Sequence, residues 1–270
     1  MYSIVIPLYN KEKYIARAIK SVLAQTYQEF EIIVINDGCT DNSANEVAMF
    51  DDDRIKIINQ VNAGVSAARN RGILEAKQSF IAFLDADDEW YPDYLESIAN
   101  LQGAYPECQV FATSYIYKDG EKSMLPNIAF KGTSGVIDNY FELACKGSPL
   151  LWTSAVTVSK KELISVGMFM DNVKSGEDLL LWAKLAQFCK IAYLNSAKAI
   201  YYFPVRIDVK LNIRMPDSKD IVYRELRKMY SVETRADIKR SMRGYIGHWC
   251  KIRLHIFSHN KKPLLAFNEY

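Results

Sequence analysis

The sequence predicts an α/β domain with a mostly parallel central sheet flanked by helices, followed by a helical C-terminal extension. Short runs of β-branched residues alternate with helical patterns through the first hundred residues, and polar residues follow the predicted strand ends. After Pro204 the strand pattern stops and the chain becomes basic and helical. A strand–helix alternation produces right-handed crossovers and a parallel sheet covered on both faces.

Four strands and three helices are expected in the first hundred residues. The strands are apolar runs that end in proline, turn residues or acids. The helices repeat apolar residues at helical spacing. In chain order these elements are strand 3–7, helix 13–25, strand 31–35, helix 41–50, strand 55–58, helix 66–76 and strand 79–84.

Beyond Asp93 the pattern is less regular. Strands are expected at 109–117 and 154–159, with a polar loop at 118–135 between them, and a helix is expected at 176–188. The segments 191–194 and 198–203 resemble a closing hairpin, and 218–262 reads as mostly helical.

Composition narrows the class of protein. The 270 residues are 49% hydrophobic and 24% charged with a net charge of +2, which is ordinary for a globular protein and indicates no nucleic-acid partner. Five scattered cysteines favour reduced thiols and no zinc site. We expect no signal peptide and no membrane span, since no apolar run approaches ~18 residues. The glycine motifs of P-loop, dinucleotide-binding and α/β-hydrolase proteins do not occur in the sequence.

Two carboxylates, Asp85 and Asp87, follow the apolar strand at 79–84. Their hard oxygen ligands suit Mg²⁺ or Mn²⁺, which bind proteins through one or two carboxylates together with substrate phosphates. The pair therefore predicts a metal–diphosphate site. The alternative is an acidic turn in which Asp88 caps the next helix.

Polar residues at other strand ends are expected at the same edge of the sheet, because ligands of such sheets bind beyond the carboxyl ends of the strands. Tyr9 and Asn10 follow the first strand, Asp37 follows the second, and Asn62 follows the third. Asp37 can accept hydrogen bonds from a nucleobase imide or a ribose hydroxyl. It can equally serve only to shape the turn before Gly38.

Glu177 and Asp178 open a predicted helix, where the helix dipole stabilises negative charge. A carboxylate held beside a sugar hydroxyl can act as a general base, and simple helix capping is the alternative. Arg69 is expected either to face a phosphate or to hold one of the carboxylates in place. Trp152 is expected either to stack on a sugar ring or to belong to the core.

Six segments together resemble the family 2 glycosyltransferases of GT-A fold, which have a Rossmann-like, mostly parallel sheet. They are 3–10 (SIVIPLYN), 21–27 (SVLAQTY), 33–41 (IVINDGCTD), 62–70 (NAGVSAARN), 83–88 (FLDADD) and 176–178 (GED). The resemblance covers about residues 3–203. Cys39 departs from it, because serine is common after that glycine.

The resemblance implies a role for each matching residue. A nucleotide-sugar donor, usually UDP-linked, would contact Pro7, Tyr9, Asn10, Asp37, Asn62, Arg69 and Asp85. Asp87, assisted by Asp85, would ligate Mn²⁺ or Mg²⁺, and Asp178, with Glu177 beside it, would be the catalytic base. Residues 1–118 would then form the donor-binding half, 119–203 the acceptor and base half, and 204–270 an extension.

The reaction that the resemblance implies is an inverting transfer to a saccharide or undecaprenyl-diphosphate-linked acceptor, in cell-surface polysaccharide, O-antigen or capsule assembly in the cytoplasm. Three other functions stay open on the residues alone. A nucleotidyltransferase would normally carry a glycine-rich loop after the first strand, a non-catalytic module would bind the nucleotide sugar without turnover, and a metal nuclease would leave Tyr9 and Asp37 without a role.

The segment 238–262 holds seven Lys or Arg residues and no acids, and apolar residues interleave with them at roughly helical spacing. Such a helix suits the surface of an anionic membrane, here the inner face of the cytoplasmic membrane. The alternative is a helix that packs its apolar stripe on the domain and exposes its charge.

Overall fold

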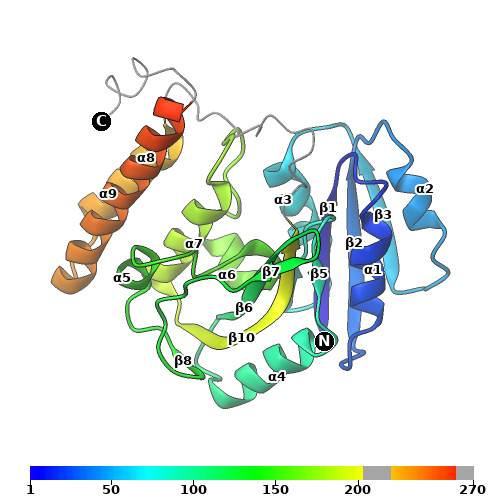
Figure 1. Ribbon diagram of the computed structural model, residues 1–270, viewed down its shortest axis with the longest axis horizontal. Helices are drawn as coiled ribbons and strands as arrows, with labels where there is room; N and C mark the ends of the chain where they lie inside the picture. Colours follow the sequence, from blue (N-terminus) through cyan, green and yellow to red (C-terminus); the bar gives the residue numbers. More distant parts are fainter. Residues whose placement is uncertain (203–219, 260–270) are drawn as a thin grey trace.

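The computed structural model describes residues 1–202 and 220–259, the side chains of the last helix as far as Ile256 (Figure 1). One sheet organises the chain, with the strands of its main path in the order β3-β2-β1-β4-β9-β6-β10-β5. β7 adds to β6, and β8 adds to β10. The predicted α/β class with a flanked central sheet and a helical extension is confirmed.

The first half alternates strands and helices as the sequence predicts. β1 pairs in parallel with β2 and β4, and β2 pairs in parallel with β3. The strand order therefore reverses direction between β1 and β4. The elements are β1 (Tyr2–Leu8), α1 (Ile15–Leu23), β2 (Phe30–Asp37), α2 (Ser43–Ala48), β3 (Ile55–Gln60), α3 (Val65–Glu75) and β4 (Phe80–Phe83).

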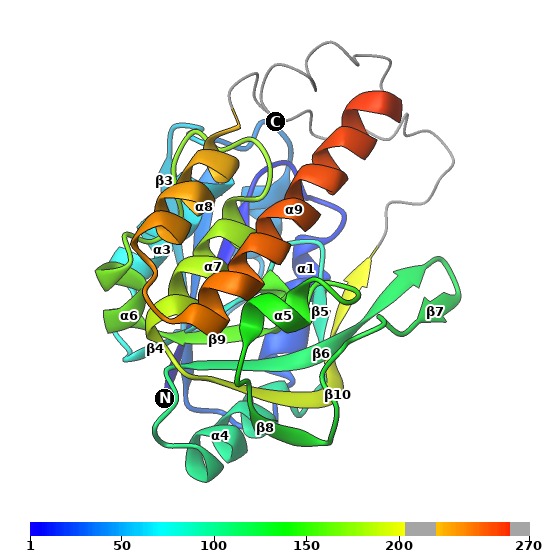
Figure 2. The same cartoon turned by 90° about the vertical axis from the view of Figure 1, so that its left-hand side faces the viewer.

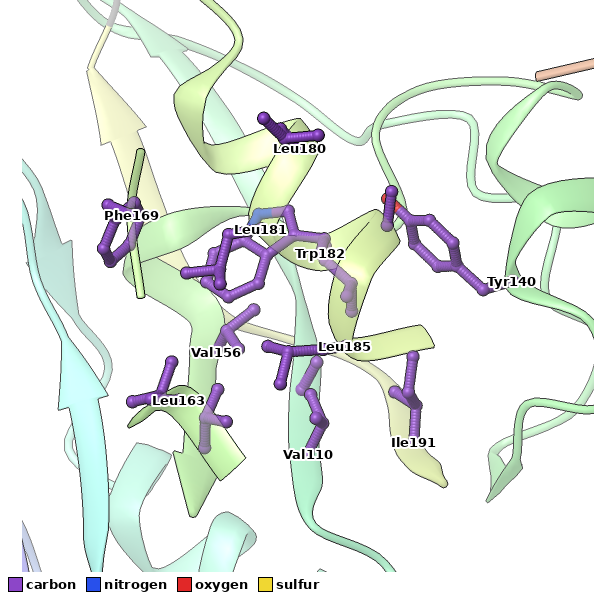
Figure 3. Packing of buried hydrophobic residues seen from close by; sticks show 14 of the residues in the cluster. Val110, Tyr140, Val156, Leu163, Phe169, Leu180, Leu181, Trp182, Leu185 and Ile191 are labelled. Atoms are coloured by element: carbon purple, nitrogen blue, oxygen red, sulfur yellow. The ribbon is translucent and has the colours of Figure 1, made fainter. Parts of the chain in front are cut away.

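Alternating residues of the strands face two separate cores, as the period of a strand requires. Val5 of β1 packs in one core with α3, α6, α7 and the C-terminal helices, whereas Ile4 and Ile6 pack in the other with α1, α2 and α4. Figure 3 shows part of the first core, where Trp182 and Leu185 of α7 lie over Val156 and Val110 of the sheet. Both faces of the sheet are thus covered, which leaves the strand ends to form a site.

The second half departs from the predicted pattern in several places. Its elements are β5 (Glu89–Trp90), α4 (Tyr94–Ala104), β6 (Val110–Asp119), β7 (Lys122–Met124), β8 (Ser134–Val136), α5 (Tyr140–Ala144), the short 3-10 helix η1 (Thr153–Ala155), β9 (Val156–Ser159), α6 (Lys160–Ser165) and α7 (Glu177–Phe188). β9 runs antiparallel to both β4 and β6. The segment expected as a polar loop at 118–135 contains β7 and reaches β8.

The prediction of a closing hairpin at 191–194 and 198–203 is wrong. The residues form one strand, β10 (Ile191–Tyr202), which is parallel to β6 and changes register between Leu194 and Ala199. The backbone N–H of Asn195 donates to the carbonyl of Thr133, and its side chain donates to the carbonyl of Gly132. The polar residues near Asn195 suggest a turn in the sequence, but their hydrogen bonds go to a neighbouring loop, so the strand continues past them. Phe203, the predicted end of the hairpin, lies outside the described residues.

The C-terminal extension contains α8 (Ile221–Val232) and α9 (Ala236–His259), which form an outer layer beyond α7 and α5 (Figures 1 and 2). The apolar stripe of α9 is buried in the first core through Ile238, Met242, Tyr245, Ile246 and Trp249. The apolar stripe of α9 therefore packs on the domain, which was the predicted alternative to a membrane surface. The basic residues 261 and 262 of the predicted amphipathic segment lie outside the described residues.

Within residues 1–202 and 220–259, no helix is both long enough and apolar enough to cross a bilayer. All five cysteines fall in this part of the chain and carry free thiols, in agreement with the prediction of reduced cysteines.

Candidate active site

A cleft of about 300 Å³ opens at the carboxyl ends of β1, β2 and β4. It lies where the strand order reverses, which is the usual position of a ligand site in an open α/β sheet. α3 and α7 and the segment before β9 complete its walls. The lining residues are Pro7, Tyr9, Lys11, Asp37, Val65, Ala68, Arg69, Asp85, Ala86, Asp87, Trp152, Thr153, Glu177, Asp178 and Tyr201.

All the residues predicted for the site line this cleft except Asn10 and Asn62. Asn10 is exposed in the left-handed region at φ 50°, and its side chain exchanges hydrogen bonds with Thr40 in the loop after β2. Asn62 is exposed in the loop after β3, with its backbone against Gly38. Both side chains thus belong to the loops around the cleft.

Asp37 is buried at the end of β2, where it organises the neighbouring loop. Its Oδ1 accepts hydrogen bonds from Gln60 Nε2 at 2.8 Å and from the N–H of Ala63 at 2.9 Å, and its Oδ2 accepts from the N–H of Gly64 at 2.9 Å. Gly64 stands directly before α3. The turn-shaping role is therefore present, and Asp37 lines the cleft as well.

Arg69 of α3 links the acids of the site. It is only 4% exposed, and its guanidinium pairs with Asp85 at 2.7 Å and with Glu177 at 3.3 Å. The same guanidinium lies 5.1 Å from the centroid of the Phe169 ring. Burial by itself would lower the pKa of Arg69, but the charges of Asp85 and Glu177 raise it above its ordinary value. Arg69 therefore stays charged and joins β4 to α7, which was one of its two predicted roles.

Asp85 and Asp87 present carboxylates to the cleft from the turn after β4. Asp85 engages Arg69 through Oδ1, and Asp87 engages Lys11 through Oδ2 at 2.5 Å. The described residues hold no group of three His, Cys, Asp or Glu side chains that could bind a metal ion unaided. Two partly exposed carboxylates still fit Mg²⁺ or Mn²⁺, which complete their coordination with water and phosphate oxygens.

Asp88 has a different role from its two neighbours. It does not cap a helix, because β5 follows it and α4 begins only at Tyr94. It is 1% exposed and accepts a hydrogen bond of 2.5 Å from Ser154 Oγ, which in turn accepts from the N–H of Asp85. Burial, together with the charges of Asp85 and Asp87, raises the pKa of Asp88 well above its ordinary value. Asp88 and Ser154 thus hold the backbone of the turn that carries Asp85 and Asp87 through buried hydrogen bonds.

Glu177 and Asp178 occupy the first turn of α7. Glu177 is buried against Arg69, whereas Asp178 is half-buried and accepts a 2.7 Å hydrogen bond from the N–H of Leu179. The Thr153 hydroxyl lies 3.4 Å from Asp178 Oδ2. Burial and the adjacent Glu177 raise the pKa of Asp178 to about 6, against the opposing effect of Arg69. A carboxylate with such a pKa is suited to accept a proton near neutral pH.

An aromatic wall faces these acids. The rings of Trp152 and Tyr201 lie 4.4 Å apart between centroids, and Trp152 also contacts Tyr115 at 5.3 Å. Trp152 and Tyr201 line the cleft, so Trp152 belongs both to an aromatic cluster and to the wall.

Lys11, Thr153 and Tyr201 were not predicted as site residues. Lys11 follows Asn10 directly after the first strand, so a cation among strand-end polar residues was a usable signal. Thr153 and Tyr201 gave no comparable signal, because their place depends on β9 and β10 lying beside β4 and β6.

A family model described as "Glycosyl transferase family 2" matches residues 3–155, more than half of the chain. The chain belongs to glycosyl transferase family 2. An uncharacterized glycosyltransferase of Rickettsia conorii is 36% identical over 186 residues, which cover 68% of this chain and 30% of the relative. Glycosyltransferase GlyA of Streptococcus pneumoniae is 31% identical over 215 residues, covering 76% of this chain and 30% of the relative. The matched part of this chain thus spans only 30% of the length of each of these relatives.

Among solved structures, TarS of S. aureus (residues 1–349, in complex with UDP-GlcNAc) is similar, with a TM-score of 0.81. The match covers 98% of this chain and 79% of the TarS chain at 19% sequence identity. This likeness establishes the GT-A fold for the family 2 domain.

Proposed function

We propose that this family 2 domain is a metal-dependent inverting glycosyltransferase, which transfers a hexose from a UDP-linked donor to a saccharide acceptor. The observation that carries the proposal is the cleft itself. Two acids for a cation, a buried arginine and an acid with a raised pKa meet at the carboxyl edge of one sheet, although they come from β4, α3 and α7.

The donor half of the reaction uses the residues on β1, β2 and β4. Tyr9, 48% exposed, lines the cleft and would contact a nucleobase, and Asp37, whose carboxylate accepts hydrogen bonds from the loop after β3, would contact the nucleoside from the end of β2. Asp85 and Asp87 would hold Mn²⁺ or Mg²⁺, and such an ion stabilises the charge that develops on a leaving diphosphate. Lys11 adds a cation beside Asp87.

The acceptor half of the reaction depends on Asp178. Its carboxylate takes the proton of the acceptor hydroxyl while the oxygen of that hydroxyl attacks the anomeric carbon. The bond from that carbon to the donor phosphate breaks, and UDP leaves with the bonding electrons. The configuration inverts because there is a single displacement. Glu177 forms a buried ion pair with Arg69 of α3, and this pair fixes the first turn of the helix that carries Asp178.

The choice of UDP is supported by the likeness to TarS, whose structures were solved with UDP and with UDP-GlcNAc. A screen of UDP-, GDP- and dTDP-sugars for nucleoside-diphosphate release with Mn²⁺ tests it. We expect UDP-sugars to be turned over fastest, and a clear preference for another nucleotide would overturn the donor assignment.

Two alternatives make different predictions. A non-catalytic module would bind UDP-sugars yet show no turnover in wild type, and Asp178→Asn would change nothing measurable. A nucleotidyltransferase would release pyrophosphate from a nucleoside triphosphate. Membership of family 2 and the placement of Asp178 in the cleft both favour the glycosyltransferase.

The remaining parts of the proposal concern the cellular setting. We propose a cytoplasmic enzyme that acts on a saccharide or undecaprenyl-diphosphate-linked acceptor in cell-surface polysaccharide assembly. Membrane contact through Ile238–Lys262 now rests on its charge, because the apolar stripe of α9 packs on the domain. Exposed Arg240, Arg243 and Lys251 supply that charge. Liposome co-sedimentation that is unchanged when all three are replaced by glutamine would refute this contact.

A further inference from the structure

The C-terminal helix α9 reaches the two residues that stand immediately before the helix of the base. Trp249 packs against Gly176, and Arg253 donates a hydrogen bond of 2.6 Å to the carbonyl of Ser175. A second nitrogen of Arg253 lies 3.3 Å from Ser175 Oγ. Ser175 and Gly176 lead directly into Glu177 and Asp178. The extension therefore contacts the backbone from which the proposed base projects.

Gly176 is held in an unusual conformation at this junction. It has φ 88° and ψ 16°, the left-handed region that glycine adopts without strain. A Cβ atom at this position would lie 2.2 Å from Cη2 of Trp249. The indole ring thus occupies the space that a side chain would fill, and it blocks the movement of the backbone toward α9.

A buried ion pair holds Trp249 and Arg253 in place. Asp220, at the N-terminus of α8, accepts a 2.8 Å hydrogen bond from the indole N–H of Trp249 and lies 3.4 Å from Arg253 Nε. The side chains of Arg253 and Asp220 are each 3% exposed, and the guanidinium stacks 4.0 Å from the Trp249 ring. A buried ion pair contributes little net stability over apolar residues of similar volume, so a specific geometric role is a better reason for it.

We propose that Asp220, Trp249 and Arg253 are positioning residues for the catalytic base. They fix the Ser175–Gly176 backbone and thereby set the direction of the first turn of α7, from which Asp178 enters the cleft. This inference rests on the proposed function of Asp178 as the base. It assigns a catalytic purpose to the extension, which lies outside the segment matched by the family model.

The expected effect follows from geometry. Asp178 is in the first helical turn, so a rotation at Gly176 moves its carboxylate relative to the acceptor hydroxyl. A displacement of about 1 Å in such a group lowers turnover on the order of 100-fold. The donor residues on β1 and β2 do not contact the extension through these bonds. Asp85 is linked to the first turn of α7 only through Arg69 and Glu177, so donor binding should change much less than turnover.

Two variants test the proposal in the full chain. Arg253→Gln removes the contacts to Ser175 and Asp220, while Trp249→Phe removes the indole N–H and the ring edge beside Gly176. Met242→Ala is the control, since Met242 is equally buried on the same face of α9 but contacts Gln187 near the other end of α7. Melting temperatures are recorded for all three, so that activities are compared on folded protein.

The first readout is amide hydrogen exchange of the segment 173–179, measured by mass spectrometry. In both test variants the amides of this segment should exchange faster than in wild type and in Met242→Ala, because a segment that loses contacts opens more often. The second readout is UDP release from the best donor of the screen. We expect kcat to fall roughly 10- to 100-fold, with a much smaller change in KM for the donor and in the Kd for UDP with Mn²⁺.

The outcomes separate this inference from the proposed function. Unchanged exchange in 173–179, or turnover in Arg253→Gln and Trp249→Phe equal to that of Met242→Ala, overturns the positioning role while Asp178→Asn stays inactive. Full turnover in Asp178→Asn overturns the base itself. If neither test variant folds, Arg253→Lys provides the same comparison, because lysine keeps the charge but lacks the planar guanidinium with its several N–H donors.

Discussion

Replacing Arg69 with methionine removes the cation that the structure places between two acids of the site while keeping a similar volume of side chain. In wild type, Arg69 pairs with Asp85 at 2.7 Å and with Glu177 at 3.3 Å, and the Glu177 side chain is only 8% exposed. The substitution therefore leaves a buried carboxylate facing an apolar group. The partly exposed Asp85 can recover water, so Glu177 carries most of the penalty.

The magnitude follows from the burial of the pair. Removing one partner of a buried ion pair costs about 3–5 kcal/mol, because the other charge is left without compensation. For a chain of this size each kcal/mol lowers the melting temperature by about 2–4 °C, so a loss of roughly 6–20 °C is expected. Arg69 also lowers the pKa of Asp178, so its removal raises that pKa and moves the acid limb of activity to higher pH.

Chemical denaturation followed by circular dichroism measures the change in stability. The matched control is Arg71→Met, on the same helix, where an exposed arginine pairs with Glu75 and contributes little to stability. A midpoint for Arg69→Met equal to that of Arg71→Met would refute the reasoning.

Two further predictions concern neighbouring residues. Because burial and Glu177 raise the pKa of Asp178 to about 6, and the base must be ionised, UDP release should fall about tenfold per unit as the pH drops below about 6; a limb near pH 4, as for an ordinary aspartate, would contradict this. Ser154→Ala leaves buried Asp88 without its 2.5 Å hydrogen bond and should lower the free energy of unfolding by about 1–3 kcal/mol. Ser165→Ala, at an exposed hydroxyl, is its control, and equal denaturation midpoints for the two variants would count against the support role of Asp88.

The parts of the molecule that the sequence predicts well are those set by local pattern. Asp37 ends one buried parallel strand and Asp85 comes shortly after another, and the carboxyl ends of parallel strands share an edge of the sheet. Their convergence in one cleft therefore needs only the strand–helix alternation. The same rule misplaced Asn62, because it fixes where a strand ends but not which way an exposed loop side chain turns.

Contacts between distant segments could not be predicted. The pairing of Arg253 with Ser175 joins residues 78 positions apart, and it exists because the stripe of α9 packs on α5 and α7. The apolar periodicity of that stripe is equally compatible with a membrane surface. Likewise, the sequence of β10 predicts two strands separated by a turn. The structure has one strand, because hydrogen bonds from Asn195 to the distant loop at 130–133 stabilise the irregular part of it.

Calorimetric titration of UDP in the presence and absence of MnCl₂, on wild type and on Asp87→Asn, tests the joint binding of a diphosphate and a cation most directly. The cleft geometry predicts tight binding by wild type only when Mn²⁺ is present, and loss of this metal dependence in a folded Asp87→Asn protein. Equal affinity for UDP in all four titrations would contradict the assignment of Asp85 and Asp87 to a metal–diphosphate site.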